Sequence, residues 1–176
     1  AQVYAASRTY NPGSGPVTTG HPPVNRVLQR GYLNKPGAEA PPGALTEISG
    51  LNARFPAGDE GQRRAALAHW LADARNPLTW RSIANRVWQY HFGRALVETG
   101  NDFGRMGALP THPELLDWLA VTFRDDLKGS LKQLHKLIVM SAAYRQSSKH
   151  RPDLREKDAQ NKLLARQHRL RLDAEI

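Results

Sequence analysis

The stretch that decides the fold runs from residue 76 to residue 114 and reads NPLTWRSIANRVWQYHFGRALVETGNDFGRMGALPTHPE. Asn76-Pro77 disfavours a continuing helix, because the residue before a proline is pushed out of the helical region. Thr79 is a suitable N-cap, and apolar side chains then recur every three or four residues until Gly93. The pattern predicts a helix over 80–92, followed by a loop that is rich in polar side chains.

Other stretches show the same helical periodicity. Thr111 with Glu114, and Ser130 with Gln133, have the spacing of capping boxes, in which two side chains satisfy free N–H groups at the start of a helix. The predicted helices span 62–75, 80–92, 111–127 and 130–144, and a last one starts near residue 160 and continues to Ile176. The sequence therefore predicts a mainly α fold, an irregular bundle of about five helices.

Residues 1–58 differ in composition, because Pro and Gly recur through them and exclude helix over most of their length. Two short strands are predicted there, at residues 2–6 and 26–32. Since such a segment cannot build its own core, we expect an irregular arm that is the tail of an upstream domain. We expect residues 59–176 to form the helical domain, truncated at its C-terminus, because the apolar stripe of the last helix would lack a partner.

Composition excludes several classes of protein. The net charge of +9 is spread evenly, with a surplus of three basic groups in each of residues 1–58, 59–148 and 149–176. Nucleic-acid binding usually needs a concentrated basic stripe, so it is disfavoured. There is no cysteine, which removes thiolate catalysis and the attachment of c-type haem. No run approaches the roughly 20 apolar residues that a membrane span requires, and we expect no cofactor in this chain.

Several motifs recur in an order and spacing that match a known family: Asn85-Arg86-Val87-Trp88, Phe92-Gly93-Arg94, Asn101-Asp102-Phe103-Gly104, residues 112–119 and residues 141–148. In these motifs the chain resembles the planctomycete surface-type domain of unknown function number 1553. The resemblance implies no established activity. It does imply an exported protein, extracytoplasmic or at the cell surface, in which this domain follows a companion domain and often a cytochrome-c-like module.

The polar residues around the predicted loop are candidates for catalysis. His91, Asp102 and His112 supply the minimum for general acid and base chemistry, and a hydrolase site on this loop is one hypothesis. The alternative is structural. His91 falls on the apolar stripe of its helix and would be a hydrogen-bonded core histidine, His112 would be an ordinary polar helix start, and Asp102 would cap backbone groups in a turn. We expect no metal site.

Other side chains are candidates for the polar core or for ligand binding. Arg86 is expected to be buried and to pair with Asp102 or Asp117, so that replacing it by Ala would lower thermal stability. Trp88 belongs to the apolar stripe. The candidate ligand-binding residues, which combine flat aromatic rings with hydrogen-bonding groups suited to sugars, are Arg94, Asn101, Trp80 and Trp118.

Two functions remain open on the sequence alone. The first is a helical module of a larger exported protein that has a structural or ligand-binding role. It would act with upstream domains of the same polypeptide on a macromolecular ligand such as an anionic polysaccharide. The second is part of a hydrolase active site built on the loop after the 80–92 helix.

Overall fold

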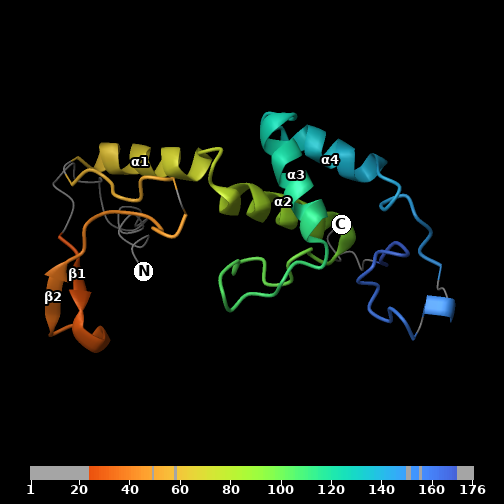
Figure 1. Ribbon diagram of the computed structural model, residues 1–176, viewed down its shortest axis with the longest axis horizontal. Coiled ribbons are helices and arrows are strands. Elements are labelled where there is room, and N and C mark those ends of the chain that lie inside the picture. Colours follow the sequence, from red (N-terminus) through yellow and green to blue (C-terminus); the bar gives the residue numbers. More distant parts are fainter. Residues whose placement is uncertain (1–23, 49, 58, 150–151, 155, 170–176) are drawn as a thin grey trace, which may run out of the picture. The chain divides into compact units, whose positions relative to one another are not determined.

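The computed structural model describes residues 24–48, 50–57, 59–149, 152–154 and 156–169 (Figure 1). The chain divides into two compact units, and the division falls between Asn76 and Pro77. The predicted boundary between 58 and 59 therefore separates the irregular arm from a helix that belongs to the same compact unit. Each unit has its own local organisation.

The first unit contains a small antiparallel sheet of β1 (Arg26–Leu28) and β2 (Pro36–Glu39). The strand predicted over 26–32 is confirmed in its first three residues. A 3-10 turn, η2 (Gln29–Gly31), follows, where Arg30 has a φ of 51° and Gly31 a φ of 78°. These left-handed conformations turn the chain back towards β2. The strand predicted at residues 2–6 lies outside the described residues.

The helix of the first unit is α1 (Glu60–Ala72), which was predicted over 62–75. The Asp59 side chain caps it by accepting a hydrogen bond from the Gln62 amide at 3.0 Å. Trp70 is buried, as its place on the apolar stripe predicts. The helix ends at Ala72 because Asp73 has an extended backbone and uses its carboxylate locally.

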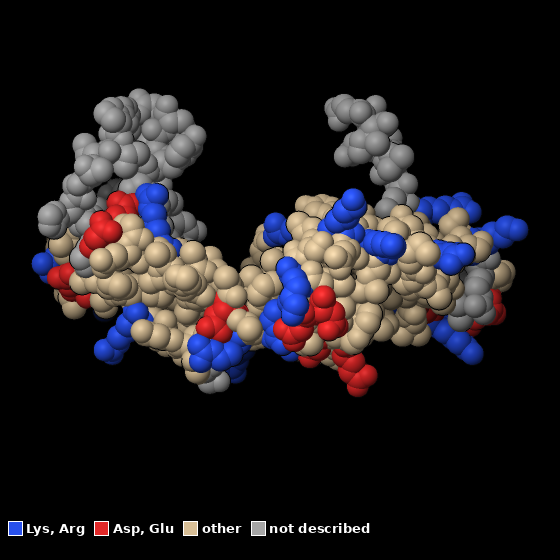
Figure 2. All heavy atoms as spheres, turned by 90° about the horizontal axis from the view of Figure 1, so that it is seen from above, with Lys and Arg blue, Asp and Glu red and all other residues tan. Residues whose placement is uncertain are grey.

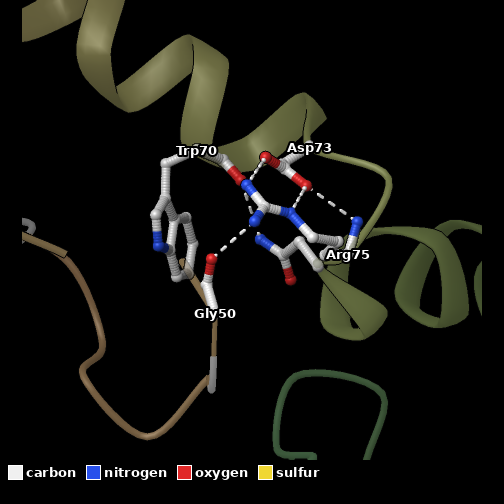
Figure 3. A network of polar contacts seen from close by, with 5 residues as sticks. Gly50, Trp70, Asp73 and Arg75 are labelled. Atoms are coloured by element: carbon white, nitrogen blue, oxygen red, sulfur yellow. Dashed lines mark hydrogen bonds and ion pairs between the residues drawn. The ribbon is translucent and has the colours of Figure 1, made fainter. Parts of the chain in front are cut away.

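Arg75 fastens the end of α1 to the preceding loop (Figure 3). The Arg75 guanidinium donates to both carboxylate oxygens of Asp73, at 3.0 and 2.8 Å, and to the Gly50 carbonyl oxygen at 2.7 Å. These hydrogen bonds from Arg75 lower the pKa of Asp73 to about 2. The arginine thus joins two segments 25 residues apart in sequence.

The second unit begins with α2 (Pro77–Phe92). The prediction that Thr79 caps this helix is wrong, because the helix starts at Pro77 and Thr79 lies inside its first turn. Proline suits a first helical position, where its missing N–H would have no partner in any case. Gly93 ends the helix with a φ of 73°, as predicted.

Helix α3 (Pro113–Asp125) follows a long loop. Thr111 was predicted as its N-cap, but His112 holds that position and caps no N–H with its side chain. Thr111 instead donates through both its amide and its hydroxyl to the Leu96 carbonyl oxygen, at 2.9 and 3.3 Å. The tertiary contact to the loop thus replaces the local cap. Gly129, with a φ of 74°, marks the predicted break after the helix.

Helix α4 (Leu131–Met140) starts where it was predicted, with the Ser130 hydroxyl accepting from the Gln133 amide at 3.4 Å. It stops at Met140 and not at residue 144. The Ser141 hydroxyl donates to the Ile138 carbonyl oxygen at 2.7 Å, which is a local alternative to a further helical turn.

The helix predicted from residue 160 is wrong for residues 160–169, which form turns and irregular chain. Buried Asn161 organises this segment, because its side chain donates to the Arg166 carbonyl oxygen at 2.7 Å and accepts from the Arg166 amide at 3.2 Å. Asn161 and Leu164 have positive φ angles of 53° and 56°, which no α-helix contains. Residues 170–176 lie outside the described residues.

The mainly α fold class is confirmed, with four α-helices among the described residues and not about five. In the second unit α3 and α4 both pack against α2 (Figure 1). The Trp88 and Phe92 rings stack with their centroids 4.0 Å apart at the centre of this core. The buried core residues are Ala84, Val87, Trp88, Phe92, Leu96, Val97, Leu116, Leu119, Phe123, Leu134 and Ile138. Among the described residues, no helix is both long and apolar enough to cross a membrane.

Candidate functional site

Asn85 attaches the α2–α3 loop to α2. Its side-chain amide donates to the Val97 carbonyl oxygen at 3.0 Å and accepts from the Val97 amide at 2.8 Å, and its exposed fraction is only 1%. Sequence reasoning did not single out Asn85 for this role. A signal was present, because Asn85 precedes Trp88 by three residues and Phe92 by seven, and therefore shares their buried face.

The loop is then held by its own polar groups. The Thr99 hydroxyl donates to the Asp102 carbonyl oxygen and accepts from the Ala108 amide, each at 2.8 Å. One carboxylate oxygen of Asp102 accepts from the Gly104 amide at 2.8 Å. Gly107 packs so closely that a Cβ there would overlap the Asp102 carbonyl oxygen. Asp102 was a catalytic candidate, and the structural alternative was that it caps backbone groups in a turn. It makes this capping contact.

The expected burial of Arg86 is wrong. Arg86 is exposed, and its guanidinium donates to the Asn101 side-chain oxygen at 2.8 Å. Asp117 is exposed too and pairs with Arg81 at 2.6 Å. The reason is the rotation of α2, which turns Ala84, Asn85, Val87 and Trp88 towards the core and Arg86 away from it. Of the proposed polar core, only Trp88 is buried.

Two ligand-binding candidates have structural contacts. Arg94 donates to the Gln160 carbonyl oxygen at 3.0 Å and also pairs with Glu98, so it ties the end of α2 to the segment near Asn161. Trp80 is half-buried and packs edge-on against Phe123, with ring centroids 5.8 Å apart. Both contacts explain these residues without a ligand.

His91 is half-buried and hydrogen-bonded, as its place on the apolar stripe predicts. Its Nδ1 lies 2.8 Å from the Val87 carbonyl oxygen, and its Nε2 lies 3.2 Å from Nδ1 of His135 on α4. The Tyr144 ring meets the His91 ring edge-on, with centroids 5.8 Å apart. Sequence reasoning did not single out His135, because its partner lies 44 residues away.

The three catalytic candidates are not brought together by any hydrogen bond or ion pair among the described residues. His91 contacts His135, Asp102 caps its own turn, and His112 Nδ1 lies 3.0 Å from the Thr111 hydroxyl. The described part of the chain also holds no group of three or more His, Asp or Glu side chains that could bind a metal ion. Within the described residues, therefore, no hydrogen bond couples one of these candidates to another as acid and base.

One more histidine has a perturbed environment. Partial burial lowers the pKa of His168, because it disfavours the imidazolium form, and the positive charges of Arg166 and Arg94 lower it further. Hydrogen bonding involving Asn161 acts in the opposite direction. The lowered pKa disfavours the charged form of His168 inside the segment that Arg94 and Asn161 organise.

A groove of about 770 Å³ opens between α3, α4 and the chain near Leu164. Its walls are largely apolar and include Leu115, Leu119, Leu137, Met140, Ala143 and Leu164. Trp118, Gln133 and Lys136 also line it, and Trp118 is 53% exposed. Its volume falls within the range of pockets that bind small molecules, roughly 300–1,000 Å³. Trp118 is the one sequence-predicted ligand-binding residue that lies in this groove.

Helix α4 carries two lysines, Lys132 and Lys136, and Lys136 lines the groove. Lys132 and Lys136 are exposed, and neither forms an ion pair with any residue in the described ranges. On the face seen in Figure 2, Lys and Arg side chains stand at separate places and form no single continuous patch. On this face, the distribution agrees with the even spread of charge along the sequence.

Comparison with known protein families identifies the chain. A model of PSD1, described as a protein of unknown function (DUF1553), matches residues 63–176. The chain belongs to this family. The match covers most of α1 and all of the described second unit, so the resemblance in the sequence motifs is confirmed at the level of the family. No curated protein matches the chain, and no solved structure does. The planctomycete setting and the cytochrome association stay predictions.

Proposed function

We propose that this chain is a non-catalytic binding module of a larger exported protein, and that the groove between α3 and α4 binds an anionic polysaccharide. The observation that carries the proposal is the position of exposed Trp118 and of Lys136, which has no ion pair within the described ranges, in the lining of one groove. The exported setting and the action together with upstream domains rest on the family resemblance alone.

The side chains of the groove fit a charged sugar chain. The flat Trp118 ring offers an apolar surface on which a sugar ring can stack, while the Gln133 amide can hydrogen-bond to hydroxyl groups. The Lys136 ammonium supplies a positive charge for a carboxylate or sulfate group. An uncharged glucan could contact Trp118 and Gln133 but would not form an ion pair with Lys136. We therefore expect the groove to bind an acidic polysaccharide more tightly than an uncharged one.

Binding of an acidic polysaccharide tests the proposal. We expect alginate to bind the full chain more tightly than uncharged dextran, measured by isothermal titration calorimetry at low salt. Trp118→Ala and Lys136→Gln should each weaken alginate binding by about twofold to twelvefold, since each contact contributes roughly 0.5–1.5 kcal/mol. Raising the salt concentration should weaken binding to the wild-type chain more than binding to Lys136→Gln.

Lys162→Gln is the matched control, because Lys162 is equally exposed but does not line the groove. Its alginate affinity should equal that of the wild type. If alginate binds no better than dextran, or if both groove variants bind like the wild type, the proposed ligand and site are wrong.

The hydrolase hypothesis is not favoured by any contact among the described residues. The hypothesis can still be tested directly with His112→Ala, because the His112 side chain hydrogen-bonds, among the described residues, to neighbouring Thr111. If the loop is catalytic, this variant should lose turnover on a panel of glycans while keeping the wild-type melting temperature. Full activity in His112→Ala, or no activity in the wild type, would remove the hypothesis.

A further inference from the structure

Two histidines from different helices meet at the surface of the second unit. His91 Nε2 on α2 and His135 Nδ1 on α4 are 3.2 Å apart, and the two rings are tilted by 44° with centroids 4.9 Å apart. The proposed polysaccharide groove uses neither side chain. The pair therefore needs an explanation of its own.

The environment of His91 fixes which nitrogen faces outwards. Nδ1 lies 2.8 Å from the Val87 carbonyl oxygen, which can only accept, so Nδ1 carries the proton and donates it. The neutral ring then has its lone pair on Nε2, directed at His135. Histidines that bind metals almost always donate their other ring N–H to a carbonyl or carboxylate in this way, which holds the ring in place.

The separation of the two nitrogens suits a shared metal ion. Imidazole nitrogens bind such an ion at about 2.0–2.1 Å, so two of them in adjacent positions are about 2.9 Å apart in square or octahedral geometry and about 3.4 Å apart in tetrahedral geometry. The observed 3.2 Å lies between these values. A metal ion could therefore bind with little movement of either helix.

The two histidines differ in burial and in the contacts that hold their rings. His91 is half-buried and meets the Tyr144 ring edge-on, so its orientation is restrained. His135 is exposed, so its ring can rotate and exchange its proton with water. In the hydrogen-bonded pair His135 donates from Nδ1, and to bind a metal it would carry its proton on Nε2 instead. This tautomer change alters neither the charge nor the number of protons on the ring.

We propose that His91 Nε2 and His135 Nδ1 together bind one divalent transition-metal ion, with Cu²⁺ held more tightly than Zn²⁺. Imidazole ligands suit both ions, and the general order of affinities places Cu²⁺ first. With two protein ligands, the remaining coordination positions are filled by water. This departs from the sequence-based expectation of no metal site, which considered His91 without His135.

Binding of Cu²⁺ alone tests the site. Copper sulfate is titrated into the full chain in a non-coordinating buffer, and electron paramagnetic resonance counts the bound nitrogens. We expect the wild type to bind Cu²⁺ through two imidazole nitrogens at this site. His135→Ala should weaken this binding more than about tenfold, because even the loss of an outer-shell partner costs 10-fold to 100-fold. Zn²⁺ should bind the same site more weakly and compete with Cu²⁺.

His112→Ala is the matched control, since it removes a different histidine beside a helix. It should keep the wild-type affinity and nitrogen count. His135 is exposed, so His135→Ala should fold, and an unchanged melting temperature without metal verifies this. The site is disproved if the wild type binds no Cu²⁺, or if folded His135→Ala keeps both the affinity and the nitrogen signal of the wild type.

Discussion

The α2–α3 loop and the α3–α4 groove contrast sharply in how their polar groups are used. The loop is dense in Asn, Asp, Thr and Arg, and hydrogen bonds within the chain engage many of these groups. The groove has few polar groups, but Trp118 and Lys136 face solvent there. A high density of polar residues in a sequence can thus indicate a self-supporting loop, while a sparse set around an apolar hollow is the better candidate for binding.

The largest expected effect is that of Asn85→Ala, which would leave the Val97 amide and carbonyl buried without their partner. Each lost partner costs roughly 1–2 kcal/mol, so the free energy of unfolding should fall by about 2–4 kcal/mol. Thermal and urea unfolding followed by circular dichroism measure it. Arg86→Ala, at the next position, should change stability by less than about 0.5 kcal/mol, because Arg86 is exposed. The reverse order would support the sequence-based expectation that Arg86 is a buried structural residue.

Gly107→Ala should have the next largest effect. The added Cβ would overlap the Asp102 carbonyl oxygen, so the backbone of the loop must shift, at a cost of about 1–3 kcal/mol. Gly104→Ala is the control, because its Cβ would lie 3.1 Å from a carboxylate oxygen of Asp102, which can move. Equal melting temperatures for the two variants would show that the loop accommodates a Cβ at residue 107 as easily as at residue 104.

Asp102→Ala should lower stability by about 0.5–1.5 kcal/mol, the usual contribution of one hydrogen bond, because the Gly104 amide loses its acceptor. Asp102→Asn keeps an oxygen at that position and should restore most of the loss. Chemical denaturation of the pair measures the difference. Stability alone does not test a catalytic role, which would show as a loss of activity in Asp102→Asn at nearly unchanged stability.

The smallest expected effect on stability is that of Trp118→Ala, in the groove. Trp118 is half exposed, and the higher helix propensity of Ala compensates for part of the lost packing. We expect the free energy of unfolding to change by less than about 0.5 kcal/mol. A loss as large as that of Asn85→Ala would make Trp118 a core residue and would exclude the groove as a free binding surface.

Local signals in the sequence predicted much of the second unit. The apolar stripe placed Trp88 in the core, Gly93 and Gly129 marked two chain breaks, and Ser130 marked the start of α4. The errors occurred where a tertiary contact replaced a local one. Thr111 bonds to Leu96 and does not cap α3, and the chain after residue 160 folds around Asn161 and forms no helix over 160–169.

The candidate site was predicted less well than the fold. Trp118 was predicted as a ligand-binding residue from its flat aromatic ring, which the sequence shows directly. Asn85, His135 and Lys136 were not singled out, because each gains its role from a partner or neighbour brought close by folding. A single sequence carries no direct record of such pairs.

The sequence by itself determined the family, the mainly α class and most of the helix positions in the second unit, because periodicity, caps and glycine breaks act over a few residues. Only the tertiary structure decided which polar side chains are engaged and which remain available. Whether Asn85 finds Val97 as its partner depends on the path of the α2–α3 loop, and whether His91 meets His135 depends on the packing of α4. These are distances between segments remote in the chain, and no local pattern specifies them.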